Sequence, residues 1–376
     1  MLYDMVKQYA GLGIHRTGTD VDRATASWLT AQLEARGATV TRQSFDFDLF
    51  AANTRVMLGE HEIPSMPLYY QATGALTTDR VGVTDFGNGE HGRGLDAVLE
   101  AKIDRALTAG YEALVIATRG ETGDLQASHC EPILRNRLPV ILVPGRYADA
   151  LSNGSPRVIY NADLTPGKSA NIIGQWGPPN APTFVITTPM SGWFSCAAER
   201  GTGLAVALQL GEWLSRQRPQ LALKLIAPSG HELGFHGACR LAETIVAAPA
   251  AVLHLGSCIA AVDGQMQGIV HAGKPVRDAV KQALAPISII PVHPENHLDA
   301  DNWVGESQCW ARFGMPMVSI AGVSPLFHTP GDLAEKATTP ELLERAADCI
   351  ADVALALIDA DEFRTAGTAE ILPRQW

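Results

Sequence analysis

The sequence is short of basic residues. It holds 29 Lys and Arg against 40 Asp and Glu, which gives a formal net charge of −11. Nucleic acids and anionic membranes are bound through clusters of Lys and Arg. This balance therefore argues against a nucleic-acid or membrane partner, and we expect a neutral or cationic small ligand instead.

Two further features are missing. The chain does not start with a basic stretch followed by an apolar one, and it has no uninterrupted apolar run near the ~20 residues that span a bilayer. The six cysteines form no Cys-x-x-Cys pair, so we interpret them as reduced thiols and not as disulfides or a zinc knuckle. These absences together predict a cytoplasmic protein.

What the chain does contain is enough apolar material for a large core. With 376 residues, 46% of them hydrophobic, it can build one large domain and a smaller one. From Ala170 onward apolar strands alternate with helical patterns, which predicts a mixed, mostly parallel α/β sheet with helices on both faces. The expected strands are Asn171–Trp176, Phe184–Thr188, Leu221–Ala227, Ala251–Gly256, Gly268–Ala272, Ile287–Pro291 and Met317–Ala321. The expected helices are Gly203–Arg216, Gly234–Val246, Val276–Leu284 and Pro340–Ile358.

The first half of the chain changes character near residue 50. A helix within residues 14–36, which we expect to pack on the main sheet, precedes a strand over Thr39–Phe50. Residues 51–164, in contrast, hold short strands, turns and one helix. We predict a catalytic domain made of 1–50 and 165–376, with 51–164 as a small inserted α+β domain. Its expected elements are the strands Val81–Asp85, Ala113–Ala117 and Val140–Val143, the helix Leu99–Thr108 and a glycine-rich loop over Asn88–Gly94.

One stretch stands out chemically: Pro228-Ser-Gly-His-Glu-Leu-Gly234, directly after a predicted buried strand. Ligands of open α/β sheets bind at the carboxyl ends of the strands. If the sheet is parallel here, Glu199, His231, Glu232 and His328, which follow different strands, would meet at one edge. Two carboxylates and an imidazole can hold a catalytic zinc with an open position for water. His231, with an unperturbed pKa of ~6.5, suits the base that takes the proton.

The order and spacing of these stretches resemble the zinc exopeptidases that include bacterial secreted leucyl aminopeptidases, glutamate carboxypeptidase II and glutaminyl cyclase. The residues that carry the resemblance are Ser229-Gly-His-Glu-Leu-Gly234 and Phe327-His-Thr-Pro-Gly-Asp332. It covers about Tyr9–Phe50 and Ala170–Leu357, and it implies a phosphorylase/hydrolase-like α/β domain. The run from Ala109-Gly110 to Leu138-Pro-Val-Ile-Leu-Val-Pro144 similarly resembles the protease-associated domain that several members of this family carry as an insertion.

The sequence departs from the family pattern at one of its two metal sites. The first metal-binding His falls on Pro189, the Asp that orients it falls on Ser191, and a further metal-binding Asp falls on Gly256. The resemblance therefore implies that this site has lost both of its private ligands.

The other metal site keeps its ligands. The bridging Asp falls on Glu199, while Glu232 and His328 match the family directly. His231 stands where the family has its general-base Glu. The resemblance thus implies one divalent metal, zinc, held by Glu199, Glu232 and His328, with His231 handling protons; a site that no longer binds metal is the alternative.

Aromatic and acidic residues near these stretches are candidates for the substrate pocket. Trp303, Glu306 and Trp310 flank a loop that borders the pocket in the family, and they could receive an ammonium or aromatic group. Trp193 and Ser191, at the end of another predicted strand, are further candidates for substrate binding. An ordinary solvated loop is the alternative for residues 291–306.

Other chemistries have weaker support. Ser191 or Ser195 with His231 would make a Ser-His-Glu hydrolase, but no Gly-x-Ser-x-Gly elbow presents either hydroxyl. Cys196, or Cys130 beside His129, could be a nucleophile, yet nothing nearby argues for a lowered thiol pKa. His254 could replace a lost ligand or could be a satisfied core histidine.

We therefore expect a divergent metallopeptidase-like hydrolase that acts on a small amide or peptide with at most one divalent metal. Two alternatives stay open. One is a cyclase, lyase or metal-free enzyme on the same scaffold. The other is a pseudopeptidase that binds a peptide or small ligand without turning it over.

Overall fold

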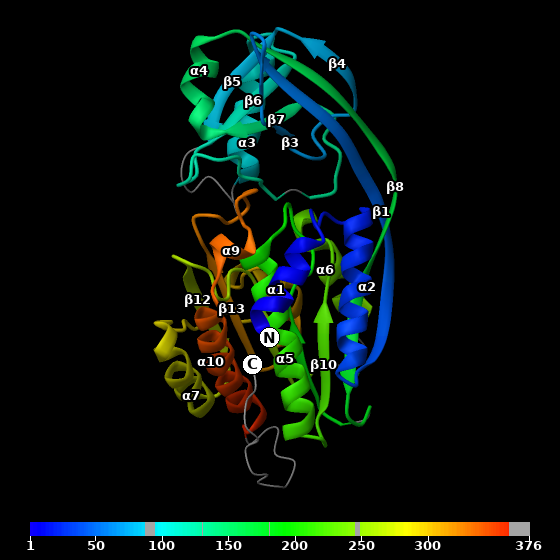
Figure 1. The fold of residues 1–376 in the computed structure, drawn as a ribbon, viewed down its shortest axis with the longest axis vertical. Helices are drawn as coiled ribbons and strands as arrows, with labels where there is room; N and C mark the ends of the chain where they lie inside the picture. The colour runs from blue at the N-terminus through cyan, green and yellow to red at the C-terminus, as the bar shows by residue number, and fades with distance from the viewer. Residues whose placement is uncertain (87–94, 130, 180, 245–248, 361–376) are drawn as a thin grey trace.

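A computed structural model describes residues 1–86, 95–129, 131–179, 181–244 and 249–360. These residues form a larger lower part and a smaller upper part (Figure 1). The larger part is built on a nine-stranded sheet with the strand order β12-β13-β11-β9-β10-β8-β1-β2, and β4 pairs with β8 off this path. The strands of this sheet are β1 Thr39–Leu58, β2 His61–Ile63, β4 Gly74–Thr78, β8 Pro156–Trp176, β9 Thr183–Thr187, β10 Ala222–Ala227, β11 Ala251–Leu255, β12 Gln265–His271 and β13 Met317–Val323. Of these, β4 lies in the upper part, where it pairs with the upper end of β8 (Figure 1).

The middle of this sheet is parallel. β13, β11, β9 and β10 run side by side in one direction, and the strands beyond them on either side are antiparallel. The central strands are buried along nearly their whole length, as expected for parallel strands covered on both faces. Their carboxyl ends consequently lie at one edge of the sheet.

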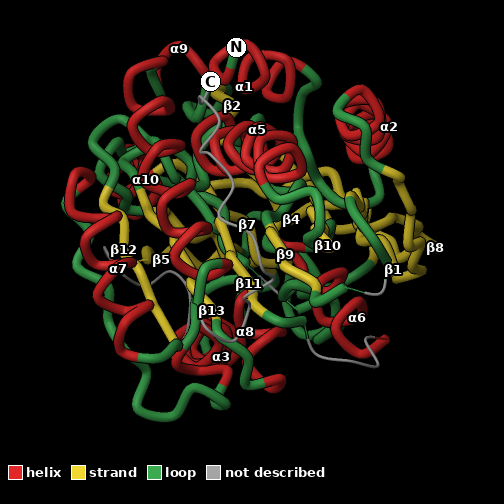
Figure 2. The backbone as a smooth tube through the Cα atoms, turned by 90° about the horizontal axis from the view of Figure 1, so that it is seen from below, coloured by secondary structure: helices red, strands yellow, loops and turns green. Residues whose placement is uncertain are grey.

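Helices cover both faces of the sheet (Figure 2). One face packs against α1, α2, α5 and α10 through a large apolar core, and the other packs against α6 and α8. The helices of this part are α1 Leu2–Gly11, α2 Asp20–Ala35, α5 Thr202–Gln217, α6 His236–Thr244, α7 Lys274–Leu284, α8 Ser307–Trp310, α9 Ala334–Ala337 and α10 Pro340–Ile358. No helix of the described residues is long and apolar enough to cross a membrane.

The upper part has a sheet of its own. Its order is β3-β7-β6-β5, with β5, β6 and β7 parallel and β3 antiparallel to β7. The strands are β3 Met66–Pro67, β5 Val81–Phe86, β6 Ala113–Thr118 and β7 Val140–Pro144, and the helices are α3 Leu95–Thr108 and α4 Ala148–Asn153. β6 and β7 are buried throughout because apolar clusters cover both of their faces.

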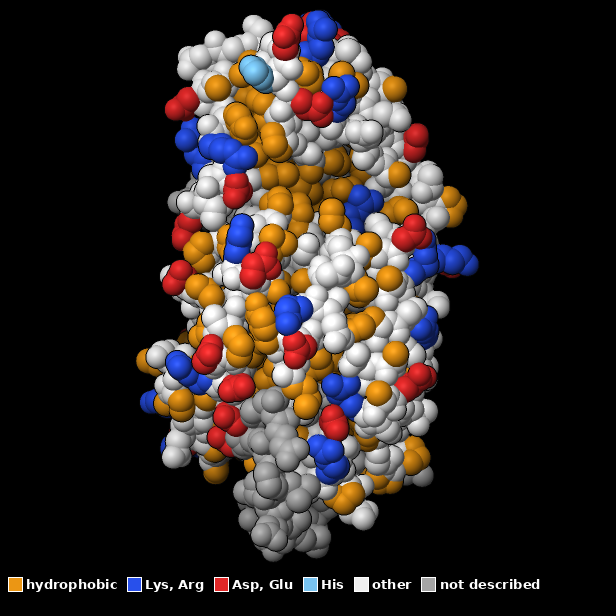
Figure 3. All heavy atoms as spheres, in the orientation of Figure 1, with side chains coloured by type: hydrophobic (Ala, Val, Ile, Leu, Met, Phe, Trp, Pro, Cys, Tyr) orange, Lys and Arg blue, Asp and Glu red, His pale blue; other side chains and the backbone are white. Residues whose placement is uncertain are grey.

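A long two-stranded ribbon joins the two parts. β1 and β8 pair without interruption from Thr39 opposite Gln175 to Leu58 opposite Pro156, and they run along one side of the molecule (Figure 1). The predicted domain limits at 50/51 and 164/165 both fall inside this ribbon. One apolar cluster also crosses the junction, and hydrophobic side chains gather over the lower half of the upper part in Figure 3.

The mixed α/β fold expected from the sequence is confirmed, with differences at particular elements. The predicted strand Ile287–Pro291 is wrong: Ala285–Ile287 forms a short 3₁₀ turn, and a single bridge joins Val292 to Ile269. The helix expected from Gly234 begins two residues later, at His236. The loop predicted over Asn88–Gly94 lies outside the described residues. Helix α1 was not predicted, although its apolar residues are buried.

The loop between α1 and α2 ties the amino terminus to the strand ends. The His15 N–H donates to the carbonyl of Phe194, and the Gly192 N–H donates to the carbonyl of His15. The His15 ring stacks on Tyr9 with centroids 3.8 Å apart, and its Nδ1 lies 2.7 Å from the Thr25 hydroxyl. Burial lowers the pKa of His15 to about 3, so the ring is neutral in the folded protein at neutral pH.

This burial predicts a pH dependence of stability. Below pH 6.5 the unfolded chain takes up a proton on His15 that the folded chain refuses until about pH 3. Acidification from pH 7 to pH 5 should therefore lower the free energy of unfolding, with His15 accounting for about 2 kcal/mol. His15→Gln should lose correspondingly less between these pH values in urea unfolding, whereas the exposed control His61→Gln should follow the wild type. Parallel losses in all three proteins would contradict this assignment.

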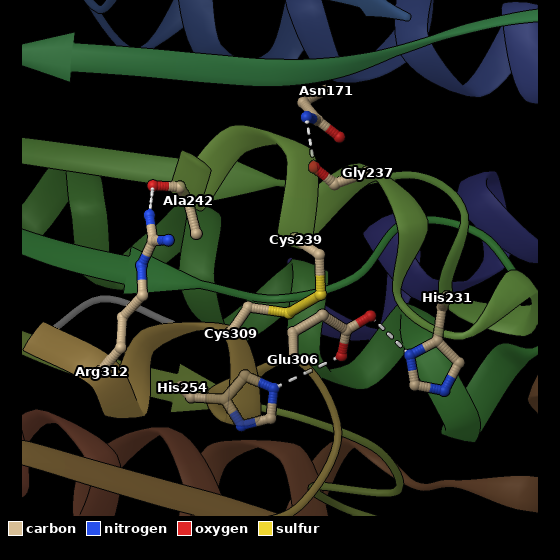
Figure 4. The surroundings of a disulfide bond; sticks show 9 residues. All are labelled: Asn171, His231, Gly237, Cys239, Ala242, His254, Glu306, Cys309 and Arg312. Atoms are coloured by element: carbon tan, nitrogen blue, oxygen red, sulfur yellow. Dashed lines mark hydrogen bonds and ion pairs between the residues drawn. A yellow bond between two sulfur atoms is a disulfide. The ribbon is translucent and has the colours of Figure 1, made fainter. Parts of the chain in front are cut away.

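The interpretation of all six cysteines as reduced thiols is wrong for one pair. Cys239 on α6 and Cys309 on α8 form a disulfide across a sequence separation of 70 (Figure 4). Cys196, Cys258 and Cys349 are buried and take no part in a disulfide. The sequence offered no sign of this pair because the two cysteines belong to separate helices that meet only in the fold. A disulfide is rare in cytosolic proteins, so it counts against the predicted location.

The disulfide predicts both a thiol count and a stability change. Six cysteines with one disulfide should leave four thiols that react in denaturant without reductant. The double variant Cys239→Ala/Cys309→Ala should lose about 4 kcal/mol of unfolding free energy, because a loop of this length is no longer closed in the unfolded chain. Reductant should lower the melting temperature of the wild type and leave that of the double variant unchanged.

Candidate functional site

The turn that carries Glu199 follows β9. Residues Ala197–Gly201 form a short π-helical turn that leads into α5. Asp332 accepts hydrogen bonds from the backbone N–H groups of Ala198 at 2.8 Å and Glu199 at 3.0 Å. This residue ends the run Phe327-His-Thr-Pro-Gly-Asp332. Its carboxylate therefore fixes the position of Glu199 from a loop that is 133 residues away in the chain.

The turn that carries His231 and Glu232 follows β10. It is a single 3₁₀ turn between Gly230 and Gly234, which have φ of 83° and 65°. The left-handed backbone at both ends suits glycine, and a side chain on Gly230 would come within 3.0 Å of the Gly237 nitrogen. On so tight a turn, neighbouring side chains point in different directions.

Glu232 points toward the amino-terminal loop. Its Oε1 accepts from the Thr17 N–H at 2.6 Å, and its Oε2 accepts from the Ser191 hydroxyl at 2.8 Å. Ser191 Oγ also accepts from the N–H groups of Gly230 and His231. Burial raises the pKa of Glu232. Both oxygens of this predicted metal ligand are thus occupied by protein donors.

His231 points to the other side, toward Glu306. The His231 Nδ1 lies 2.5 Å from Glu306 Oε1, and the second oxygen of Glu306 lies 3.6 Å from His254 Nε2 (Figure 4). Burial lowers the pKa of His231 to about 4, assisted by the charge of Arg200. Burial alone would raise the pKa of Glu306, but its contact with His231 holds it well below the ordinary range. A neutral ring that donates from Nδ1 leaves its Nε2 lone pair free.

His328 lies in the loop after β13 and is paired with the upper part. Its backbone has φ of 60°, which is uncommon for a residue other than glycine. The Ala127 N–H donates to the His328 carbonyl at 2.9 Å, and His328 Nδ1 lies 3.1 Å from the Ala127 carbonyl oxygen. The Gln126 amide adds a bond to the Phe327 carbonyl. This two-way pairing leaves His328 Nε2 pointing away from the backbone.

The same pairing brings His129 to the site. Its ring lies 4.5 Å from that of His328 and 4.7 Å from that of His231, measured between centroids. One ring nitrogen from each of the three can lie within 4.8 Å of the others. His129 Nδ1 and His328 Nε2 are buried without a hydrogen-bond partner among the described residues. We call His129, His231 and His328 the histidine cluster.

Glu199 and Arg200 adjoin this cluster. Glu199 Oε1 lies 3.4 Å from His328 Nε2 and 2.8 Å from Arg200 Nη2. Burial alone would raise the pKa of Glu199, but the charges of His328 and Arg200 hold it far below its ordinary value. Glu199 is therefore ionised. Its Oε1 faces His328 Nε2, whereas Glu306 contacts the Nδ1 of His231.

A cavity of about 670 Å³ opens onto His129 and His231. Its walls mix aromatic, aliphatic and uncharged polar side chains with the carboxylate of Asp301, and no Lys or Arg of the described residues lines it. The lining includes Phe235, Phe327, Met266, Val304, Ser257, Gln265, Gln267, Gln308, Asn302 and Asp301. A substrate bound here would present its reacting group to the histidine cluster.

The substrate-binding candidates lie at different depths. Trp303 lines the cavity, although its indole N–H is bonded to the His297 carbonyl. Trp310 is buried behind it in an apolar cluster. Trp193 packs against Tyr69 in the apolar cluster at the junction of the two parts. Glu306 contacts His231, and Ser191 contacts Glu232, as described above.

Two open alternatives are weakened by these contacts. The Ser191 hydroxyl is engaged with Glu232 and backbone N–H groups, so it does not face the His231 ring as a nucleophile would. Burial raises the pKa of Cys196 well above its ordinary value, which disfavours a reactive thiolate. His254 is wholly buried, with Nδ1 beside the Ser319 hydroxyl and Nε2 toward Glu306.

Sequence reasoning missed three residues of this site. His129 comes from the inserted segment and belongs to no motif. Arg200 adjoins a recognised ligand position, and an Arg next to an acidic residue in an apolar stretch was the available signal. Asp332 was visible as the last residue of the His-Thr-Pro motif, but its capping role depends on a contact between two loops.

Ser191 provides a test of the hydrogen-bonded support under the site. Ser191→Ala should lower the free energy of unfolding by about 3 kcal/mol, because two backbone N–H groups and one Glu232 oxygen lose their buried partner. The control Ser27→Ala removes one exposed bond to the Arg23 carbonyl and should change it by less than about 0.5 kcal/mol. Urea unfolding of both variants measures the difference; equal values would show that this support is weak.

Solved structures of two peptidases and a glutaminyl cyclase have a similar fold. A zinc aminopeptidase from Bacillus subtilis matches with a TM-score of 0.74 at 17% identity, covering 94% of this chain and 93% of that one. A peptidase M28 precursor from Shewanella amazonensis matches at 0.72 and 16%, covering 100% and 95%. A glutaminyl cyclase from Porphyromonas gingivalis matches at 0.53 and 13%, covering 95% and 96%.

No family model and no curated protein matches the sequence. At identities this low, the structural matches establish the fold alone. They confirm the resemblance found in the sequence at that level: the chain has the fold shared by zinc aminopeptidases, peptidase M28 proteins and glutaminyl cyclases.

Proposed function

We propose that this protein is a hydrolase of small amides or peptides that uses one zinc ion held by His129, His231 and His328. The observation that carries the proposal is the histidine cluster itself, in which three ring nitrogens converge beside a cavity that His129 and His231 line. His129 Nδ1 and His328 Nε2 are buried without protein partners, and leaving such groups unsatisfied is costly. Structural neighbours named as zinc aminopeptidases and a peptidase support the same class.

The donors fit zinc in their chemistry. Neutral imidazole is a common zinc ligand, and three histidines with an open fourth position make a catalytic set. Metal-binding histidines usually donate their other N–H to a carboxylate or a backbone carbonyl. His231 has Glu306 in this role, and His328 has the Ala127 carbonyl. These partners fix the tautomer that leaves the second ring nitrogen free.

This ligand set differs from the one implied by the sequence. Of the three ligands expected from the sequence, only His328 is kept. His129 and His231 take the places of Glu199 and Glu232, so His231 becomes a ligand instead of the base. Bound zinc would polarise a substrate carbonyl and lower the pKa of water to about 7. Glu199 Oε1 lies 3.4 Å from His328 Nε2 and would place a negative charge beside the ion. Glu306 orients His231, and the cavity would hold the substrate beside the cluster.

A second candidate is a binding protein without turnover. It is favoured by the position of Glu232, whose oxygens are both engaged by Thr17 and Ser191, and by the absence of a carboxylate at position 231. In this case the cavity would hold a small peptide or amide and leave it intact.

Zinc binding and turnover can be measured together. Metal-stripped protein should take up one zinc ion per chain, and His129→Ala and His328→Ala should each weaken binding by at least about a hundredfold, since a ligand is lost. The exposed control His61→Ala should bind as the wild type does. Zinc-loaded wild type should hydrolyse members of a panel of aminoacyl and N-acyl amides, whereas His328→Ala should not.

Each outcome has a distinct meaning. Zinc uptake without consumption of any substrate would favour the binding protein. Failure of the wild type to take up stoichiometric zinc would overturn the proposed metal centre. Unchanged zinc affinity in His129→Ala would exclude the inserted segment from the ligand set.

A further inference from the structure

Arg200 has no role in the proposed function, yet it is among the largest fully buried side chains. It lies on the turn that carries Glu199, and its Nη2 is 2.8 Å from the Glu199 oxygen that faces His328. A guanidinium inside a protein is costly unless it is paired and hydrogen-bonded. The contacts that offset this cost indicate what the residue does.

The guanidinium makes few hydrogen bonds, and it is held mainly by its charge attraction to Glu199. Nε donates to the Ser191 carbonyl at 3.0 Å, and Nη1 donates to the Glu199 carbonyl at a long 3.5 Å. Nη2 lies 2.8 Å from Glu199 Oε1, but it makes no hydrogen bond of good geometry with any described residue. An arginine that served only the packing would be expected to satisfy its donors more fully.

Glu199 is the residue on which this charge acts. Its Oε1 contacts Arg200 Nη2 at 2.8 Å and His328 Nε2 at 3.4 Å. The same oxygen has no hydrogen-bond partner among the described residues, and Oε2 has only the Cys196 thiol at 3.5 Å. A carboxylate so placed would coordinate a metal ion at the cluster unless another cation held it.

We infer that Arg200 is a fixed cation that keeps the Glu199 carboxylate beside the metal ion and outside its coordination. This inference rests on the proposed zinc centre. Arg200 is a positioning residue: it touches Glu199 and the Ser191 carbonyl, and it acts on the centre through Glu199. In that position Glu199 lies beside the ion as an ionised carboxylate and is not one of its ligands.

The charges of the site agree with this role. Glu199 and Glu306 are both buried, and each faces a different partner: Arg200 Nη2 lies 2.8 Å from Glu199 Oε1, and His231 Nδ1 lies 2.5 Å from Glu306 Oε1. The guanidinium is thus a fixed positive charge next to the cluster, and it would repel a second cation there.

The inference is tested by whether zinc binds more tightly or more weakly when the charge of Arg200 is removed. In metal-stripped full-length protein, Arg200→Met removes the charge and keeps most of the volume. Zinc should then bind about ten- to hundredfold more tightly, because a repelling charge is gone and Glu199 is free to coordinate. Arg200→Lys keeps the charge and should stay within about threefold of the wild type. A role in packing alone predicts weaker binding in Arg200→Met.

Two more variants complete a double-mutant cycle of Arg200 and Glu199. In Arg200→Met/Glu199→Gln the gain should vanish, since the liberated carboxylate is absent. Glu199→Gln alone should change zinc affinity by less than about tenfold, because Glu199 is outside the coordination. This single variant decides the matter even if Arg200→Met does not fold, as judged by thermal unfolding in chelator.

The outcomes separate the two proposals. If Arg200→Met folds and binds zinc no more tightly than the wild type, or if Glu199→Gln loses a hundredfold or more, the inference is overturned while a wild type with one zinc leaves the proposed centre standing. If the wild type takes up no zinc, both proposals fall.

Discussion

Burial of charge is the constraint on which the rest of this site depends. Glu199, Glu232, Glu306 and Asp332 are each at most 1% exposed, and an ionised carboxylate removed from water needs a partner. Each has a different one: Arg200 for Glu199, the Thr17 N–H and Ser191 hydroxyl for Glu232, His231 for Glu306, and two backbone N–H groups for Asp332. These pairings fix which carboxylates can act on a ligand and which serve the fold.

The inserted segment is part of the same arrangement. The ribbon of β1 and β8 carries it above the strand ends, and the pairing of Ala127 with His328 fastens its loop to the loop after β13. Without this contact His129 would not reach the cluster and His328 would lose the acceptor for its Nδ1. The histidine cluster is therefore a product of both parts of the molecule.

Much of this could be predicted from the sequence, because the patterns involved are local. Alternating and continuous apolar runs located the central strands, and the parallel order of those strands brings Glu199, His231 and His328 to one edge. What failed depended on contacts between distant segments. The direction of Glu232 is set by Thr17 and Ser191, which no motif connects to it.

His129 and the disulfide were missed for the same reason. His129 stands in an inserted loop whose sequence carries no metal-binding spacing, so only the tertiary contact with residues 327–328 reveals it. Cys239 and Cys309 are separated by 70 residues and meet because α6 and α8 pack on the same face of the sheet. A predicted strand at Ile287–Pro291 failed because an apolar run alone does not provide a pairing partner.

The ligand set determines what kind of centre the proposed zinc ion would form. Carboxylate ligands neutralise part of an ion's charge, whereas three neutral imidazoles leave it intact, so a carbonyl at the open position would be polarised more strongly. The carboxylates are then needed behind the histidine ligands and not on the ion itself. Glu306 supports a ligand, and Glu199, restrained by Arg200, places a negative charge beside the ion. Replacing carboxylates by histidines at the ion thus depends on keeping carboxylates, and one arginine, directly behind them.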